Sequence, residues 1–521
     1  METSEATTTC ERRATAYRRR QPENSLLYQI VSAHLESFLA RAADLADGRG
    51  LPPFVERELR AYLRCGILAH GFVRVHCDTC GQDALVGFSC KGRGFCPSCG
   101  GRRMADTAAH LVDRVLPHVP IRQWVFTVPV RLRYAIAFDR ELALRVRSIF
   151  VRAVLGWMRR RALQAGIAFP EVGAVTAVQR FGSALNLNVH FHTLVLDGAY
   201  RSDWRGEGLR FVPLESPSDA ELERLLSVIR SRVCSLLRRR GLLQPESSEL
   251  DSSGPFDSPA LDACAAASAV HRVALGQDAG RPLARRRSPA RVVLSTIPKQ
   301  RCVAQDGYSL HANVRVAARD RGRLERLCRY LMRPPISDAR LALTEAGRIE
   351  LELKTPYSDG TTHLVLDPMT FLERIAALVP PPRAHLVVYH GVLASAAASR
   401  ADIVPHPSHP AFPTEERATE HDSSTSPPNH HPTARSPPPR SRNYTWAELM
   451  KRVFLVDVLQ CPCGGSRRLI ASITEADTIA RILRCLGLAE TFPARGPPRL
   501  APTASAAEPA PDSGEVRLVL E

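Results

Sequence analysis

Two closely spaced cysteine pairs are the first residues in the chain with a defined chemistry. Cys77 and Cys80 form one C-x-x-C pair, and Cys96 and Cys99 form a second pair fifteen residues later. Four thiolates at this spacing are typical of a zinc ribbon, in which each pair supplies two corners of a tetrahedral site. Because four protein thiolates leave no position for water, we expect the zinc to be structural. Three nearby residues could replace a ligand or build a second site, namely Cys65, His76 and Cys90.

Two histidines in an apolar segment could hold a different metal. His190 and His192 lie two residues apart in LNVHFHTLVL. In a strand, both imidazoles would project from one face while Phe191 points to the other. Two imidazoles on a rigid strand can bind a divalent ion, although such a pair is also typical of ordinary histidines on a polar face.

A tyrosine lies within a basic helical segment from Asp320 to Pro335. At about 100° per residue, Tyr330 falls on one helix face together with three arginines, Arg323, Arg326 and Arg333. Guanidinium groups bind phosphate oxygens with paired hydrogen bonds, and a tyrosine hydroxyl among them can either donate to a phosphate or attack it. The alternative is a solvated basic face with a tyrosine packed at its edge.

The overall charge indicates a polyanionic partner. The sequence has 70 Lys and Arg against 53 Asp and Glu, which gives a formal net charge of +17. An excess of this size attracts nucleic acid through its phosphates. Four basic residues near the second cysteine pair could form a phosphate-binding face or only a solvated rim, namely Lys91, Arg93, Arg102 and Arg103.

The apolar segments do not predict a membrane protein. None reaches the roughly 18 residues that a spanning helix needs, and Met1 to Asn24 lacks the apolar core of a signal peptide. We therefore expect a cytoplasmic protein with no membrane partner. In that compartment the 14 cysteines stay reduced, so close pairs favour metal binding over disulfides.

Apolar periodicity predicts the elements that must position these residues. Helices are expected at 26–45 and 54–63, followed by the cysteine-rich module and a helix at 104–116. The histidine pair lies in a predicted strand at 187–196, and the tyrosine helix ends at Pro334. Further strands are expected at 123–130, 173–178, 291–295, 310–316 and between 341 and 366, with helices at 141–164, 220–243 and 369–378. This alternation predicts an α+β fold with a largely antiparallel sheet.

Changes in composition divide the chain into segments. We expect a flexible N-terminus at 1–24, a helical and zinc-binding domain at 25–118, and a larger domain at 119–400 with an insertion or linker at about 245–285. Residues 401–443 are so rich in Pro, Ser, His and Arg that they predict a disordered tether. A small C-terminal segment at 444–487 and a disordered tail at 488–521 follow.

Six blocks of the sequence resemble the insertion-sequence-91-type transposases, which belong to the HUH endonuclease superfamily. The resemblance extends from about Tyr17 to about Pro405. The blocks are FSCKGRGFCPSCGGRRM, QRFGSALNLNVHFHTLVLDG, LHANVRV, RLCRYLMRPP, DGTTHLVLDP and YHGVLA.

The resemblance implies a fold and a mechanism. The fold would be an HUH-type antiparallel sheet flanked by helices. His190 and His192 would hold Mg²⁺ or Mn²⁺ against a scissile phosphate of single-stranded DNA, and Tyr330 would attack that phosphate. The product would be a 5′-phosphotyrosine link and a free 3′-OH, as used in rolling-circle-like transposition. The zinc ribbon would help to bind DNA at the element ends, and target DNA would be a further partner.

The resemblance also implies a third metal ligand, and two features depart from the family pattern. Gln179, on the strand before the histidine pair, is the favoured third ligand, with His311 as the alternative. Arg326 stands four residues before Tyr330, where some relatives have a second tyrosine, so the chain resembles the one-tyrosine branch. Cys461 and Cys463 are spaced C-x-C where the family has C-x-x-C. That spacing favours a remnant without function over a C-terminal metal site.

Two other functions fit parts of the sequence. One is a zinc-ribbon DNA-binding protein without catalytic activity, although His190, His192 and Tyr330 are all present. The other is a rolling-circle replication initiator or relaxase. The sequence contains no G-x-x-x-x-G-K-[ST] motif, which excludes the helicase-fused relaxases.

Overall fold

The computed structural model describes residues 15–16, 19–45, 48–202, 209–243, 258–287, 300–405, 445–454 and 456–488. The strand expected at 291–295, most of the tether at 401–443 and nearly all of the tail at 488–521 lie outside the described residues. Within the described part, helices are combined with antiparallel sheets, which confirms the predicted α+β class.

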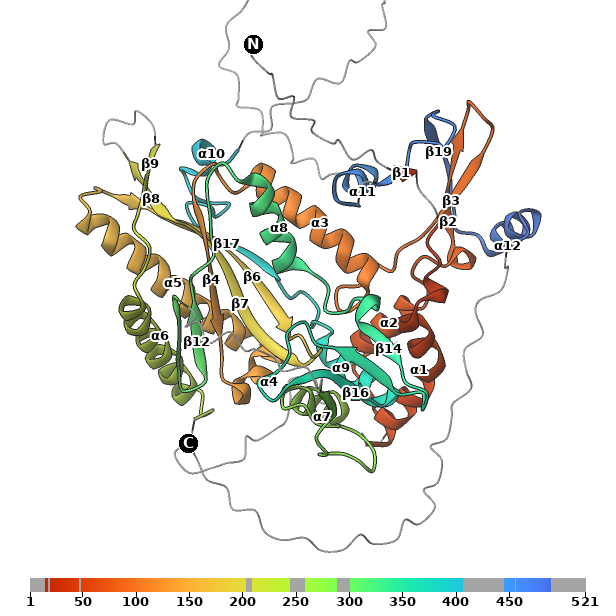
Figure 1. Ribbon diagram of the computed structural model, residues 1–521, viewed down its shortest axis with the longest axis horizontal. Helices are drawn as coiled ribbons and strands as arrows, with labels where there is room; N and C mark the ends of the chain where they lie inside the picture. The colour runs from red at the N-terminus through yellow and green to blue at the C-terminus, as the bar shows by residue number, and fades with distance from the viewer. Residues whose placement is uncertain are drawn as a thin grey trace, which may run out of the picture.

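A seven-stranded sheet forms the centre of the molecule (Figure 1). Its order is β11-β12-β4-β7-β6-β17, with β13 also paired to β4, and all of these pairs are antiparallel. The strands are β4 (Ile121–Thr127), β6 (Gly173–Phe181), β7 (Leu187–Leu196), β11 (Cys302–Gln305), β12 (Tyr308–His311), β13 (Arg315–Val316) and β17 (Val387–Gly391). The histidine pair therefore lies on β7, a central strand, with the predicted bounds.

Helices cover both faces of this sheet. One face packs against α4 (Val130–Phe138) and α5 (Arg140–Gln164), where Phe191 of β7 stacks near Phe126 and Phe150. The opposite face packs against α3 (Pro97–Arg114) and α8 (Arg321–Met332). Because successive side chains of a strand point to opposite faces, this second face is the one that receives both histidines.

Helix α8 carries Tyr330 and has one apolar stripe. Leu324, Cys328 and Leu331 are buried against the sheet and α3. Asp320 caps the N-terminus by accepting a hydrogen bond from the backbone N–H of Arg323 at 2.9 Å. Pro334 and Pro335 follow the helix and prevent its continuation. Tyr330 lies outside this stripe, and 38% of its surface stays exposed.

A four-stranded sheet and several helices lie beside this centre. The sheet has the order β10-β16-β15-β14, made of β10 (Ala284–Arg287), β14 (Leu341–Leu343), β15 (Ile349–Glu352) and β16 (Thr361–Leu366). The longer helices around it and the central sheet are α1 (Leu26–Leu45), α2 (Pro53–Tyr62), α6 (Asp219–Arg239), α7 (Pro259–Ala269) and α9 (Pro368–Leu378). Two shorter ladders pair β1 (Thr15–Ala16) with β18 (Val456–Asp457), and β5 (Pro170–Glu171) with β8 (Gly198–Ser202) and β9 (Leu209–Pro213).

Helix α7 corrects the interpretation of 245–285 as an insertion or linker. Ser258 caps this helix, and its Leu261 and Cys264 are almost completely buried in the main core. The Ala-rich sequence hides the helix because small side chains give little amphipathic contrast, while they allow close packing against α9. Residues 244–257 of the same segment lie outside the described residues.

The C-terminal segment is not separate from the N-terminal domain. Strand β19 (Arg467–Ile473) pairs with β2 (Phe72–Cys77), which pairs with β3 (Asp83–Gly87), and α12 (Ala476–Cys485) packs on the same small core. Helix α11 (Trp446–Phe454) lies along α3 (Figure 1). Its Arg452 pairs with Asp113 of α3 and with Glu325 of α8, at 3.0 Å from the latter.

None of the helices in the described part of the chain has the length and the apolar character that a membrane crossing requires.

Candidate functional site

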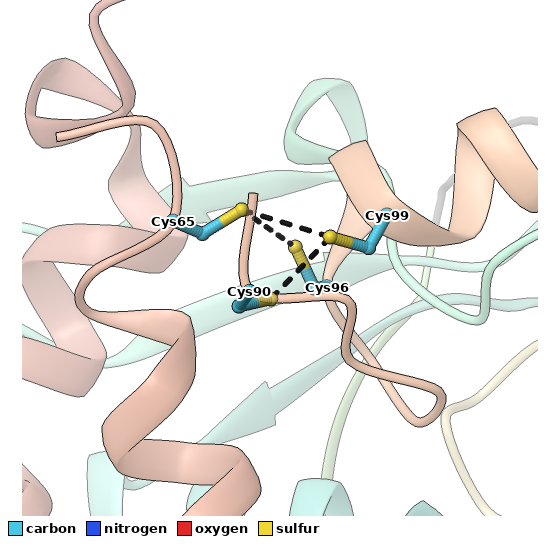
Figure 2. A group of neighbouring side chains, drawn as sticks. All are labelled: Cys65, Cys90, Cys96 and Cys99. Carbon is cyan, nitrogen blue, oxygen red and sulfur yellow. Dashed lines mark hydrogen bonds between the residues drawn. The ribbon is translucent and has the colours of Figure 1, made fainter. Parts of the chain in front are cut away.

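Four cysteines gather at the N-terminal end of α3 (Figure 2). Cys65 follows α2, Cys90 lies in the loop after β3, Cys96 is the residue before α3, and Cys99 is in its first turn. The Sγ of Cys99 lies 3.4 Å from that of Cys90 and 3.8 Å from that of Cys65, and Cys96 lies 3.6 Å from Cys65. A tetrahedral zinc with Zn–S bonds of about 2.3 Å places its sulfurs about 3.8 Å apart. We name this group the α3 cluster, and it fits a closed thiolate site.

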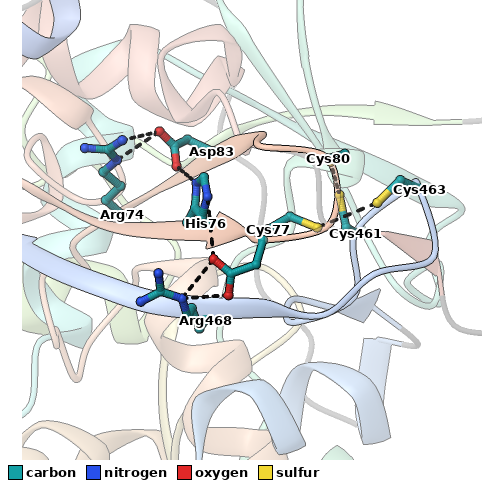
Figure 3. A network of polar contacts seen from close by, with 9 residues as sticks. Arg74, His76, Cys77, Cys80, Asp83, Cys461, Cys463 and Arg468 are labelled. Carbon is teal, nitrogen blue, oxygen red and sulfur yellow. Dashed lines mark hydrogen bonds and ion pairs between the residues drawn. The ribbon is translucent and has the colours of Figure 1, made fainter.

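A second group of four cysteines connects the β2–β3 hairpin of the N-terminal domain with the C-terminal segment (Figure 3). The Sγ atoms of Cys77 and Cys463 are 3.6 Å apart, and so are those of Cys80 and Cys461. Hydrogen bonding from the backbone of Cys80 lowers the pKa of the Cys77 thiol to about 6, which favours the thiolate that a metal requires. We name this group the β2–β19 cluster.

The structure divides the predicted ligand set between these two clusters. Cys77 and Cys80 do not meet Cys96 and Cys99, because the β2–β3 hairpin carries the first pair away from α3 and toward β19. The expectation that Cys461 and Cys463 are a remnant is wrong, since they complete the β2–β19 cluster. Of the neighbours considered as replacement ligands, Cys65 and Cys90 join the α3 cluster.

His76 serves a different purpose, in a polar network beside the β2–β19 cluster (Figure 3). Its Nδ1 lies 2.7 Å from Asp83, which also pairs with Arg74 across the hairpin. On the other side, Arg468 of β19 donates to Asp78 at 2.8 Å. Asp78 lies between Cys77 and Cys80, so this ion pair ties β19 directly to the cysteine turn.

The two histidines lie side by side on the face of the central sheet that packs against α3 and α8. Their ring centroids are 4.8 Å apart, and burial lowers the pKa of His190 to about 4 and the pKa of His192 well below its ordinary value. Both rings are therefore neutral at physiological pH, which is the form that binds a metal ion. Gln179 is the direct neighbour of His190 across the β6–β7 pair.

Hydrogen bonds orient the two rings. Nδ1 of His190 donates to the backbone carbonyl of Asn188 at 2.8 Å, which leaves the lone pair on Nε2. Nε2 of the Gln123 amide lies 2.8 Å from Nδ1 of His192 and donates to it; only the reversed amide, with its oxygen toward Nδ1, would leave the lone pair on Nε2 of His192. Within the described residues, Nε2 of His192 and Oε1 of Gln179 are buried and have no hydrogen-bond partner. Buried polar atoms without a partner are costly unless a ligand binds them.

His311 lies farther from the histidine pair than Gln179 does. It pairs with Val125 of β4, which pairs with His192, so two strand spacings of about 4.8 Å each separate His311 from His192. The choice of Gln179 over His311 as the third ligand stays a prediction.

Tyr330 reaches this group of side chains from α8. Its ring meets the ring of His192 edge-on, with centroids 6.0 Å apart. Arg333 lies over the Tyr330 ring at 4.2 Å from the centroid, and Nζ of Lys354 lies at 4.3 Å. The tyrosine is therefore flanked by two cations and one neutral imidazole, a setting suited to an anionic ligand such as a phosphate group.

Only one of the three predicted arginines contacts the tyrosine. Arg333 does, from the C-terminal cap of α8, whereas Arg323 and Arg326 lie exposed along the helix. Sequence reasoning missed Lys354, which lies in the loop after β15 of the four-stranded sheet, and it missed Gln123, which lies within an apolar strand. Neither residue has a local motif, so their approach to the site becomes visible only once the sheets are assembled.

A narrow crevice lies between the C-terminal end of α8, just after Tyr330, and the start of α3, just after Cys99. Its walls include Gln179, Arg180 and Phe181 of β6, the end of α8 with Arg333, and the start of α3 with Arg103. Arg93 also lines it and donates to the backbone carbonyl of Ala384. Four arginines thus line this small crevice, namely Arg93, Arg103, Arg180 and Arg333, and guanidinium groups attract phosphate.

Comparison with protein families agrees with this arrangement. Residues 173–401, which contain the histidine pair and Tyr330, match the transposase family model Y2_Tnp. Residues 30–128, which contain six of the clustered cysteines, match the zinc-binding domain of insertion-sequence-91 transposases. No curated protein and no solved structure matches the chain. The zinc-binding domain and the two clusters support structural zinc, and together the two family matches support an insertion-sequence-91-type transposase.

Proposed function

We propose that this transposase cleaves single-stranded DNA at the ends of an insertion element by attack of Tyr330, in the manner of an HUH endonuclease. The observation that carries the proposal is the edge-on contact of Tyr330 with His192, on the sheet face where Oε1 of Gln179 and Nε2 of His192 lack partners among the described residues. The proposed nucleophile and two of the proposed metal ligands are thus on the same face of the sheet, which supports the proposal.

The side chains present fit a divalent ion. His190 and His192 would hold Mg²⁺ or Mn²⁺ through their Nε2 atoms, and Gln179 would hold it through Oε1. When bound, the ion would polarise the scissile phosphate as a Lewis acid. Gln179 and His192 are buried and His190 is half-buried, which limits the access of water to these side chains.

The protein residues would carry out the transfer of the strand. The Oη of Tyr330 attacks the phosphorus atom and loses its proton, the P–O3′ bond breaks, and the released 3′ oxygen takes up a proton. Arg333 and Lys354 neutralise the phosphate oxygens as charge develops on them. The phosphotyrosine link conserves the energy of the bond, so transfer of the strand to target DNA needs no ATP.

A covalent adduct is the direct test of this proposal. The purified protein is mixed with Mn²⁺ and labelled single strands from the DNA that flanks its own gene, and the products are separated on a denaturing gel. A protein-linked fragment supports the proposal. Binding of these strands without an adduct, under both Mg²⁺ and Mn²⁺, would show instead that the protein only binds DNA.

Replacing His190 by alanine is expected to lower the rate of adduct formation by at least about 100-fold, since it removes one of two imidazoles from the metal site. Gln179→Ala is expected to have a smaller effect, because an amide is a weaker ligand than imidazole. His363→Ala is the matched control: this histidine lies on β16, where its Nδ1 contacts Thr362, and its loss should leave the rate unchanged. An unchanged rate in the His190→Ala protein would contradict the assignment.

We further propose that each cysteine cluster holds one structural zinc. The purified chain should therefore contain two zinc ions, and Cys461→Ser should reduce this number to one. Because the β2–β19 cluster ties β19 to β2, the same variant should make the C-terminal segment more sensitive to limited proteolysis, whereas the α3 cluster is retained. Metal analysis by mass spectrometry checks the stoichiometry, with Cys485→Ser as a control, because Cys485 is exposed and belongs to neither cluster.

A further inference from the structure

A cavity of about 500 Å³ lies on the face of the central sheet opposite to the two histidines. Its walls come from the junction of α4 and α5, from β6 and β7, and from the loop before β17. Most of the lining is apolar and includes Phe138 and Phe191, the latter pointing away from its neighbours His190 and His192. The cleavage reaction proposed above does not use this cavity.

Arg180 is a buried cation in the wall of this cavity. Only 8% of it is exposed, and its guanidinium lies over the ring of Phe138 at 4.9 Å. One nitrogen, Nη1, donates to the backbone carbonyl of Ala137. Its Nε and Nη2 are buried and have no partner among the described residues. Burial lowers the pKa of Arg180 only to about 10, so the side chain stays charged at neutral pH.

The acidic groups of the cavity do not neutralise Arg180. Asp139 pairs with Arg240 at 2.6 Å, and Glu141 pairs with both Arg240 and Arg145. Arg147 also lines the cavity and has a buried Nε without a partner in the described chain. The cavity thus has unsatisfied donors and apolar walls, so a ligand with adjacent acceptors and a flat apolar body would complement it.

Nε and Nη2 lie on one edge of the guanidinium plane and can donate two parallel hydrogen bonds. Guanine presents O6 and N7 as adjacent acceptors, which makes it the base that arginine binds best. A free phosphate also offers adjacent acceptors, but it is poorly matched to walls formed by aromatic and aliphatic side chains. A base, in contrast, packs its faces against such side chains.

The cavity adjoins the crevice at the end of α8. Both are lined by Val178, Arg180 and Leu386. Strand β17 pairs with β6 only as far as Ala177, after which Val178 donates to the carbonyl of Leu386. A single strand of DNA that lies in the crevice can therefore pass around β6 beyond Ala177. It can then place one base on the opposite face of the sheet.

We propose that the cavity binds one extruded guanine of the single-stranded DNA, through Nε and Nη2 of Arg180, and thereby sets which sequence is presented to Tyr330. This inference rests on the proposed binding of single strands in the crevice. It assigns Arg180 a role in sequence specificity that is distinct from cleavage.

The test compares the affinity of the protein for three oligonucleotides by fluorescence polarisation. They are an oligothymidylate of about 20 residues, the same strand with one central guanine, and the same strand with one central 7-deazaguanine, which lacks the N7 acceptor. The full chain is expected to bind the guanine strand roughly 10-fold more tightly than the other two, as one bidentate contact allows. Arg180→Lys, which keeps the charge and removes the paired donors, should bind all three strands alike.

Two further variants keep the test decisive. Ala143→Phe fills the cavity from a half-buried position on α5 and should also remove the preference, even if Arg180→Lys folds poorly. Arg159→Lys, an exposed position on the same helix outside the cavity, should retain it. Equal affinity of the unaltered protein for the three strands, or a preference that survives both cavity variants, would overturn the assignment. Absence of the covalent adduct would overturn the cleavage proposal alone and leave the guanine preference to be measured.

Discussion

Tyr330→Phe is expected to lower adduct formation by at least about 1,000-fold, which corresponds to roughly 4 kcal/mol of lost transition-state stabilisation. The change removes only the hydroxyl oxygen, which is the atom that would form the bond to phosphorus. The ring remains between His192, Arg333 and Lys354, so the packing of α8 and the charge of the site are preserved. DNA binding should therefore stay within about twofold of the original, because no cation is lost.

Tyr389→Phe provides the matched control for this experiment. Tyr389 lies on β17 and packs against the same apolar cluster as α8, but its ring contacts Arg400 instead of the histidines. The Tyr389→Phe protein should cleave at the original rate. An adduct that persists in the Tyr330→Phe protein and disappears with Tyr389→Phe would identify Tyr389 on β17 as the nucleophile and refute our proposal.

Cys96→Ser is the second change for which we expect a large effect. A structural zinc contributes roughly 10–16 kcal/mol of apparent binding energy in small zinc domains, so loss of one thiolate from the α3 cluster should unfold the region around it. Phe95, which is fully buried against Tyr62, would lose its packing at the same time. We expect the thermal midpoint to fall by more than 10 °C, a magnitude in keeping with several kcal/mol in a chain of this size.

The damage should extend from the α3 cluster to the site of cleavage. The start of α3 lies so close to the end of α8 that a Cβ on Gly100 would come within 2.8 Å of Pro334. Disorder at Cys96 would therefore displace Pro334 and the neighbouring Arg333. Cys96→Ser should lose both DNA binding and adduct formation, in contrast to Tyr330→Phe, which loses only the adduct. A Cys96→Ser protein with two zinc ions and an unchanged thermal midpoint would show that Cys96 is not required to hold a metal ion.

Local periodicity was enough to predict the elements that hold the histidines and the tyrosine. Helix α1 and strand β7 have the expected bounds, because each has an uninterrupted apolar pattern of one period. Helix α4 and strand β17 were not predicted. The short segment VRLRYAIAF has weak amphipathic contrast, and β17 is only five residues long and partly buried throughout.

The metal sites were harder to predict than the strands. The spacing of Cys77, Cys80, Cys96 and Cys99 identifies zinc chemistry, but it does not determine which pairs share an ion. That choice depends on the direction of the β2–β3 hairpin and on a partner strand, β19, that lies almost 400 residues away. Long-range pairing of this kind has no signature within any short window of sequence.

The β2–β19 cluster also has a consequence for the order in which the molecule matures. All four thiols of the α3 cluster have left the ribosome once residue 99 has emerged. The β2–β19 cluster, in contrast, can form only after the synthesis of Cys463, which lies 386 residues after Cys77. Closing so long a loop brings a penalty that grows only slowly with its length, so the late pairing is feasible. The first zinc can be acquired during synthesis, and the second can be acquired only by a nearly finished chain. A polypeptide that is cut short before residue 461 can therefore reach, at most, a form with one metal ion and no strand beside the outer edge of β2.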